Sequence, residues 1–205
     1  MAQKDTLLEH IQAHPLTRVG DLYAAGFTRM AVRRAIERGD LVKLARGIVG
    51  APEASAAVDL PELLACMTTG GVLGCGTAAA RHSLTNALPT TVDIIVPHAV
   101  VRPRLDFKDR QVRIFRTRDA RALTLGVQSE TQFGVELRVT SPARTVVDLW
   151  RTMKKGSEQH VWEAVHRYLD EGGSAQELRD LAEAFGIRDP VDLFLAARST
   201  STWNM

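Results

Sequence analysis

The chain has 205 residues, of which 45% are hydrophobic and 24% are charged, and its formal net charge is +2. This composition is typical of a globular protein with enough apolar residues for a buried core, in one large or two small domains. The longest apolar runs are too short to cross a bilayer, which excludes a transmembrane helix, and the polar N-terminus has no signal-peptide core, so we expect a cytoplasmic protein.

The cysteine content argues against a disulfide or a metal. Cys66 and Cys75 are the only cysteines, and in a cytoplasmic protein two reduced, buried thiols are expected rather than a disulfide. The sequence has no CxxC pair and no cluster of histidines. We therefore expect neither a metal site nor another cofactor.

Two helices are predicted ahead of a third, basic one. The first, residues 4–13, places its leucines and isoleucine on one side. The second, about residues 18–25, would begin at Thr17 as its N-cap. Gly26 and Phe27 then form a tight turn. Two helices joined by a short turn that contains glycine are typical of a helix-turn-helix.

The third helix is short and has clear start and stop signals. Thr28 can cap its first turn, and Gly39 suits the left-handed residue after its last turn. Val32, Ala35 and Ile36 form a narrow apolar stripe, so the other side chains, most of them arginine, share the open side. This pattern predicts a basic helix with one buried face.

A small basic hairpin is predicted directly after this helix. Strands at residues 41–44 and 48–49 are joined by a turn that Gly47 permits. Residues 29–46 carry six Lys/Arg against two acidic residues, a balance of +4. Helices followed by a basic wing predict a winged helix-turn-helix over residues 1–50 that binds double-stranded DNA. The expected DNA contacts are Thr28, Arg29, Arg33, Arg34, Arg38, Lys43 and Arg46.

Charge alone does not establish this interpretation, because a solvated helix face would carry the same arginines. The hairpin behind the helix and the helices in front of it favour DNA. Arginine can pair bidentately with guanine or neutralise phosphate.

Residues 51–60 are small and polar without apolar periodicity and are predicted to be a linker. Residues 61–205 are predicted to be an α/β (α+β) domain with a mixed sheet, ending in a helical region. The last 50 residues carry four Lys/Arg against nine Asp/Glu, so this end is acidic. Strands are predicted at 91–97, 112–115 and 135–140, and helices at 61–68, 78–84, 142–153, 158–169, 175–185 and 191–197.

A second basic cluster falls in the strand-rich part. On one sheet these side chains could form a second phosphate-contacting surface. The alternatives are a solvated surface or a face that docks an acidic protein. The residues are Arg102, Arg104, Arg110, Arg113, Arg116 and Arg118.

Enzymatic sites are not predicted. A nuclease would need carboxylates and a lysine near one sheet edge, and Asp93, Glu136 and Lys108 are the nearest candidates. Their spacing is unremarkable, and the two carboxylates are expected to point outward from their strands. His82 and His98 could be assembled with Ser83, but no nucleophile-elbow motif supports this. His82 is expected to interact with the free backbone carbonyl groups at the C-terminal end of its helix.

A helix is expected to begin within residues 140–149. Ser141 is the expected cap and Pro142 the first helical residue. Arg144 and Asp148 lie one turn apart, in the order that stabilises a helix less, so they either serve another contact or form a surface ion pair. The surface ion pair, worth roughly 0–1 kcal/mol, is expected.

Three segments of the chain carry a resemblance to a known family. Residues 39–49 read GDLVKLARGIV, residues 74–84 read GCGTAAARHSL, and residues 139–149 read VTSPARTVVDL. Together they resemble the AbiEi family of antitoxins from type IV toxin–antitoxin systems. The first resembles that family's G-x-L-x-x-L-x-R-G-x-Y segment, with Val49 in place of the aromatic residue, and the second its small-residue helix ending in His-Gly-Leu, with Ser83 in place of the glycine. The third is similar to its V-T-S-P-A-R-T-L-V-D-L block.

The resemblance implies a transcriptional autorepressor whose winged helix binds inverted repeats in its own promoter. It also implies a C-terminal domain that opposes a toxin of nucleotidyltransferase type. By matching position, Arg29, Arg33, Arg34 and Arg46 would contact DNA. The alternatives are a stand-alone winged-helix regulator with a ligand- or partner-sensing domain, or a DNA-targeted nuclease. A palindromic operator would need a dimer or two monomers on paired half-sites.

Overall fold

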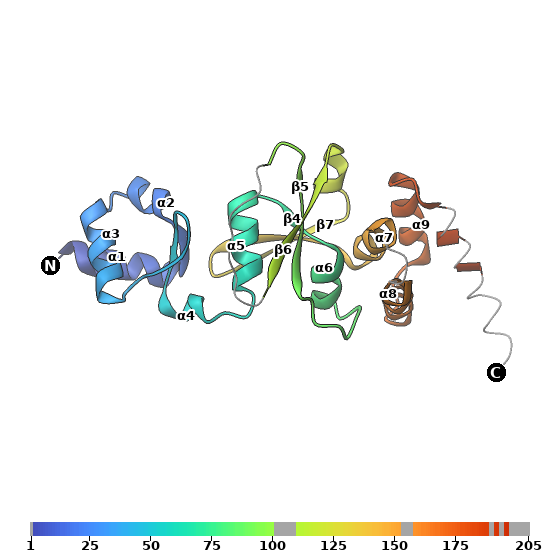
Figure 1. The fold of residues 1–205 in the computed structure, drawn as a ribbon, viewed down its shortest axis with the longest axis horizontal. Helices are drawn as coiled ribbons and strands as arrows, with labels where there is room; N and C mark the ends of the chain where they lie inside the picture. The colour runs from blue at the N-terminus through green and yellow to red at the C-terminus, as the bar shows by residue number, and fades with distance from the viewer. Residues whose placement is uncertain (1, 101–109, 153–157, 189–190, 193–194, 197–205) are drawn as a thin grey trace.

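The N-terminal part of the chain combines three helices with a small antiparallel sheet (Figure 1). The computed structural model of the protein describes residues 2–100, 110–152, 158–188, 191–192 and 195–196. The elements are α1 (Ala2–Ala13), β1 (Leu16–Arg18), α2 (Val19–Ala24), α3 (Arg29–Arg38), β2 (Val42–Ala45) and β3 (Ile48–Gly50). Apolar side chains of the three helices, of β3 and of residues next to them form a core, which contains Leu7, Ile11, Leu22, Val32, Ala35, Leu41, Val49 and Ala51.

Strand β1 corrects the sequence prediction at Thr17. This residue is not a helix cap: it lies in β1 opposite Val49 of β3. Arg18 occupies the N-cap position of α2 and makes no side-chain capping hydrogen bond. Val49, the pairing partner of Thr17, is 32 residues away in sequence, so local capping signals could not reveal it.

A five-stranded mixed sheet forms the middle of the molecule, in the order β6-β5-β4-β8-β7. Its outer pairs differ, because β5 and β6 are parallel whereas β7 and β8 are antiparallel. The short central strand is antiparallel to β5 and parallel to β8. The strands are β4 (Val72–Leu73), β5 (Thr91–Pro97), β6 (Gln111–Thr117), β7 (Val127–Gln132) and β8 (Val135–Thr140).

Helices cover both faces of this sheet. Helix α5 (Leu60–Thr69) lies on the side of the N-terminal unit, and α6 (Cys75–Arg81) and α7 (Pro142–Thr152) lie on the other side (Figure 1). Helices α8 (Glu158–Asp170) and α9 (Ala175–Ala184) extend the α7 side into a second apolar core. The predicted helix at 191–197 lies partly outside the described residues.

Besides β1, the sequence analysis did not predict strands β4 and β7, for different reasons. Strand β4 has only two residues, so no alternation can be read from it. Strand β7, with the sequence VQSETQ, is a mostly exposed edge strand without an apolar face. The remaining strand and helix positions agree with the predictions to within a few residues, and the predicted mixed helix-and-strand class is confirmed.

The predicted linker contains a one-turn helix, α4 (Pro52–Ser55). Leu16 and Ile48 of the N-terminal sheet belong to the same apolar cluster as Leu63 of α5. The Arg18 guanidinium also donates to the carbonyl oxygen of Met67. The two parts of the chain are therefore packed against each other through α5. Within the described residues, no helix has the length and apolar character needed to span a membrane.

Candidate nucleic-acid interface

Helix α3 begins and ends at the caps that the sequence predicted. Thr28 Oγ1 accepts a hydrogen bond from the backbone N–H of Ala31 at 3.1 Å. Gly39 follows the last turn with φ of 83°, in the left-handed region. Val32 and Ala35 are buried, so the opposite face of the helix is open to solvent.

A groove of about 580 Å³ lies between α3 and the hairpin, along the apolar stripe of the helix, and Val32, Ile36 and Glu37 of α3 are among its lining residues. Four predicted DNA contacts line it: Arg29 and Arg33 from α3, Lys43 from β2, and Arg46 from the turn. The other three predicted contacts, Thr28, Arg34 and Arg38, are exposed but lie outside the groove lining.

Internal ion pairs hold two of these arginines. Arg33 Nε lies 2.7 Å from Glu37 Oε1, and their side chains are 72% and 56% exposed. Arg38 pairs with Asp40 at 2.7 Å. Such exposed pairs contribute only about 0–1 kcal/mol, so an external phosphate can compete for either arginine. Within the described part of the chain, no ion pair is formed by Arg29, Arg34, Lys43 or Arg46.

Sequence reasoning missed Tyr23. This side chain of α2 is 39% exposed and lines the groove. The guanidinium carbon of Arg29 lies 5.9 Å from its ring centroid. A signal was available, because a helix over these residues that buries Leu22 places the neighbouring Tyr23 on another face.

The structure divides the second basic cluster. Arg110 pairs with Glu62 at 3.2 Å, and Arg113 pairs with Asp93 at 2.5 Å. Arg116 and Arg118 are exposed. Arg102, Arg104 and Lys108 lie outside the described residues. Two of the predicted surface cations are therefore counter-ions for carboxylates of the fold.

Asp93 corrects the prediction that it points outward. Its side chain is 1% exposed, and its carboxylate accepts hydrogen bonds from Arg113, from Thr91 Oγ1 at 2.8 Å and from the backbone N–H of Gly76 at 3.0 Å. Glu136, in contrast, is exposed and accepts from Ser129 Oγ. Strand β4 and the width of the sheet separate these two carboxylates, since β5 and β8 flank β4. Among the residues described, no group of three or more His, Cys, Asp or Glu side chains could hold a metal ion.

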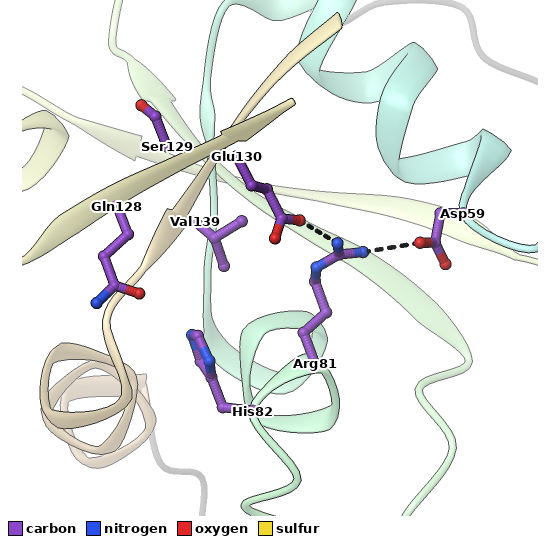
Figure 2. A pocket seen from close by; sticks show the side chains of 7 residues that line it. All are labelled: Asp59, Arg81, His82, Gln128, Ser129, Glu130 and Val139. Carbon is purple, nitrogen blue, oxygen red and sulfur yellow. Dashed lines mark hydrogen bonds and ion pairs between the residues drawn. The ribbon is translucent and has the colours of Figure 1, made fainter. Parts of the chain in front are cut away.

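Arg81 is the centre of a second polar cluster, beside a cavity of about 410 Å³ (Figure 2). Its guanidinium binds Glu62 at 2.6 Å and Asp59 at 3.2 Å, and it also contacts Glu130 of β7. Burial raises the pKa of the Glu62 carboxyl, against the opposing effect of Arg81. Three carboxylates around one arginine leave no excess positive charge for an anion.

His82 acts differently from its prediction. Its Nε2 donates to the carbonyl oxygen of Thr140, at the end of β8, at 2.6 Å. The ring therefore ties α6 to the sheet and does not cap its own helix.

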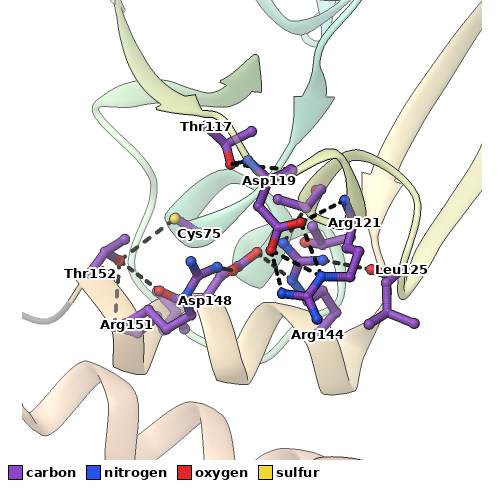
Figure 3. Close-up of polar contacts among 12 residues, drawn as sticks. Cys75, Thr117, Asp119, Arg121, Leu125, Arg144, Asp148, Arg151 and Thr152 are labelled. Atoms are coloured by element: carbon purple, nitrogen blue, oxygen red, sulfur yellow. Dashed lines mark hydrogen bonds and ion pairs between the residues drawn. The ribbon is translucent and has the colours of Figure 1, made fainter. Parts of the chain in front are cut away.

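Arg144 is the clearest correction to the sequence analysis, because the predicted surface ion pair is fully buried (Figure 3). The Arg144 and Asp148 side chains are 0% and 3% exposed, and Nε lies 3.0 Å from Oδ2. Arg144 also donates to the carbonyl oxygens of Leu125 at 2.6 Å and Ala122 at 3.3 Å. Its guanidinium carbon lies 3.9 Å from the ring centroid of Phe185. Arg144 thus ties the segment before β7 and the end of α9 to α7.

Comparison of the chain with protein-family models gives no match. Comparison with curated proteins gives no match either.

Proposed function

We propose that the chain is a DNA-binding transcription regulator whose residues 1–50 act as a winged helix-turn-helix. The observation that carries the proposal is the groove between α3 and the hairpin, which Arg29, Arg33, Lys43 and Arg46 line. These cations come from two elements adjacent in space, as they do where a recognition helix and a wing contact one duplex.

In this proposal α3 enters the major groove with its open face. Arg29, Arg33 and Arg34 contact guanine edges or phosphates, and Lys43 and Arg46 of the hairpin neutralise phosphates of the adjacent backbone. Binding at the promoter excludes the transcription machinery by occupying the operator. Glu37 holds Arg33 in the unbound protein and is available to accept from a cytosine amino group.

The resemblance to AbiEi antitoxins supports a more specific form of the proposal. The regulator represses its own operon at inverted repeats, and its C-terminal domain opposes a nucleotidyltransferase-type toxin. Two of the resembling blocks contain contacts described above: the half-buried ones of Arg81 and His82, and the buried pair of Arg144 and Asp148. Their similarity supports a shared C-terminal fold, whereas the toxin partner rests on the resemblance alone.

A second candidate is a stand-alone regulator whose C-terminal domain senses a small molecule. It is favoured by an apolar cavity of about 360 Å³ between α6 and α8. The nuclease alternative is disfavoured because protein donors already occupy both carboxylate oxygens of Asp93.

The test is salt-dependent binding to the DNA upstream of the gene, measured by fluorescence anisotropy against random duplex. Arg33→Ala/Arg34→Ala should abolish the preference for the upstream DNA. If both arginines contact phosphate, the salt slope should also fall by about 2. Arg179→Ala/Arg188→Ala removes the same charge from the C-terminal helical part and should change neither quantity. Equal affinity for both duplexes, unaffected by the first double substitution, would refute the proposal.

Toxin neutralisation is tested separately by co-expression with the product of any adjacent nucleotidyltransferase gene. If growth rescue persists in Arg33→Ala/Arg34→Ala, toxin neutralisation is assigned to the C-terminal domain. Failure of rescue with intact DNA binding would favour the stand-alone regulator.

A further inference from the structure

A cavity of about 360 Å³ lies between the outer face of the sheet and the helical tail. Its walls come from α6, β6, α7, α8 and the segment that connects α6 to β5. Ala79, Phe115, Leu149 and Val161 give it a mainly apolar lining. The volume falls within the roughly 300–1,000 Å³ of small-molecule sites.

Polar contacts between α8 and the segment that connects α6 to β5 fix one wall of the cavity. Glu163 of α8 accepts from Thr85 Oγ1 and from the backbone N–H of Asn86, each at 3.2 Å. Arg167 binds Glu163 at 2.9 Å and donates to the carbonyl oxygen of Ser83 at 3.0 Å. The connecting segment is therefore anchored to α8 by the protein itself, and the cavity does not require a ligand to form.

Arg113 is the charged group of the lining, and its orientation is fixed. Asp93 binds it side-on, with Nε–Oδ1 of 2.8 Å and Nη2–Oδ2 of 2.5 Å. The guanidinium carbon lies 5.1 Å from the ring centroid of Phe115, also in the lining. Side-on pairing leaves the end of the guanidinium, Nη1 and the second hydrogen of Nη2, for another acceptor. Nη1 has no hydrogen-bond partner among the residues that the structure describes.

We propose that this cavity binds a small molecule with an apolar, preferably aromatic, body and one carboxylate. The body lies against Phe115, Leu149 and Val161, and the carboxylate accepts two hydrogen bonds from the free end of the Arg113 guanidinium. A planar carboxylate matches the fork of donors that this end presents. His160, at the exposed side of the lining, supplies a further polar contact.

The other two cavities do not fit such a ligand. The groove beside α3 is lined by several cations and suits a polyanion. In the cavity beside Arg81, three carboxylates surround the cation. Four cations line the groove beside α3, whereas the cavity at Arg113 has a mainly apolar lining with one arginine. An inorganic anion would leave its apolar walls uncovered.

The test is calorimetric titration of the full chain with benzoate, phenylacetate and 3-phenylpropionate, each compared with its primary amide. At least one acid should bind saturably, with its amide about tenfold or more weaker because the charge-assisted pair is lost. Ala87→Trp places a large side chain at an exposed residue of the lining and should abolish the binding of both compounds. Circular dichroism checks that each variant is folded.

Arg113→Lys keeps a cation beside Asp93 but loses the fork, so the preference for acid over amide should fall about tenfold. Arg116→Lys, on the same strand and outside the lining, is the matched control and should leave both affinities unchanged. Absence of saturable binding by all six compounds, or binding unaffected by Ala87→Trp, would overturn the site. A preference unchanged in Arg113→Lys would overturn the role of the arginine. These titrations contain no DNA, so their outcome is independent of the DNA-binding proposal.

Discussion

Arg144→Met tests whether the buried ion pair holds the C-terminal half together. The substitution keeps an unbranched apolar stem but removes the charge and three donated hydrogen bonds. Asp148, 3% exposed, keeps Arg151 as a partner at 3.1 Å, but the Arg151 side chain is 34% exposed. The backbone carbonyl oxygens of Leu125 and Ala122 each lose the hydrogen bond that Arg144 donates to them. Removing one partner of a buried pair costs about 3–5 kcal/mol, and each orphaned acceptor about 1–3 kcal/mol.

Since these terms overlap, we expect a loss of about 4 kcal/mol in the free energy of unfolding, or about 8–16 °C in Tm for a chain of this size. Urea unfolding is followed by the fluorescence of Trp150 and Trp162, whose rings lie 5.4 Å apart on α7 and α8. Arg121→Met is the control, because Arg121 binds Asp119 at an exposed position and should change the unfolding free energy little.

The pH dependence of this loss provides a second check. Burial raises the pKa of the Asp148 carboxyl even with Arg144 present. An acid with a raised folded-state pKa stabilises the protein at low pH and loses that contribution as pH rises through the folded pKa. Arg144→Met removes the main opposing charge, so the pKa should rise further. The difference in unfolding free energy between the wild type and the variant should therefore shrink as pH falls from 7 toward 5. A loss below about 1 kcal/mol at pH 7, or a deficit that grows on acidification, would refute this reasoning.

Three further predictions concern other parts of the chain. Burial raises the pKa of the Cys66 and Cys75 thiols to about 12 each, so only about one molecule in ten thousand carries either thiolate at pH 8. Ellman's reagent should therefore react with neither thiol in the native protein and with both in guanidinium; rapid native reaction would contradict the burial. Glu37→Gln releases Arg33 and removes a negative charge from the proposed DNA surface. It should raise affinity for random duplex several-fold at low salt, and unchanged affinity would place α3 away from DNA. Thr28→Ala removes the cap of α3 and should cost about 1 kcal/mol by circular dichroism during urea unfolding, whereas Thr28→Ser should cost little.

The sequence was sufficient where the physical cause is local. Thr28 and Gly39 mark the two ends of α3, because a capping oxygen and a left-handed glycine act within one turn of the helix. Strand β8 followed from the alternation of Val135, Leu137 and Val139. The cations beside α3 could also be predicted to lie together, since the helix and the hairpin that carry them are contiguous in sequence.

Only the tertiary structure determined the role of those residues whose burial depends on partners far away in the sequence. An Arg–Asp spacing of four residues is the same on a surface and in a core, and only the approach of Leu125 and Phe185 placed Arg144 inside. Asp93 is buried because β6 brings Arg113 beside it, and this contact divided the second basic cluster. Thr17 became a strand residue because β3 offers unpaired backbone groups that a local capping rule does not include. Local patterns therefore determined most of the elements and the proposed DNA surface, while the charges of the C-terminal half acquired their roles only from pairing across the fold.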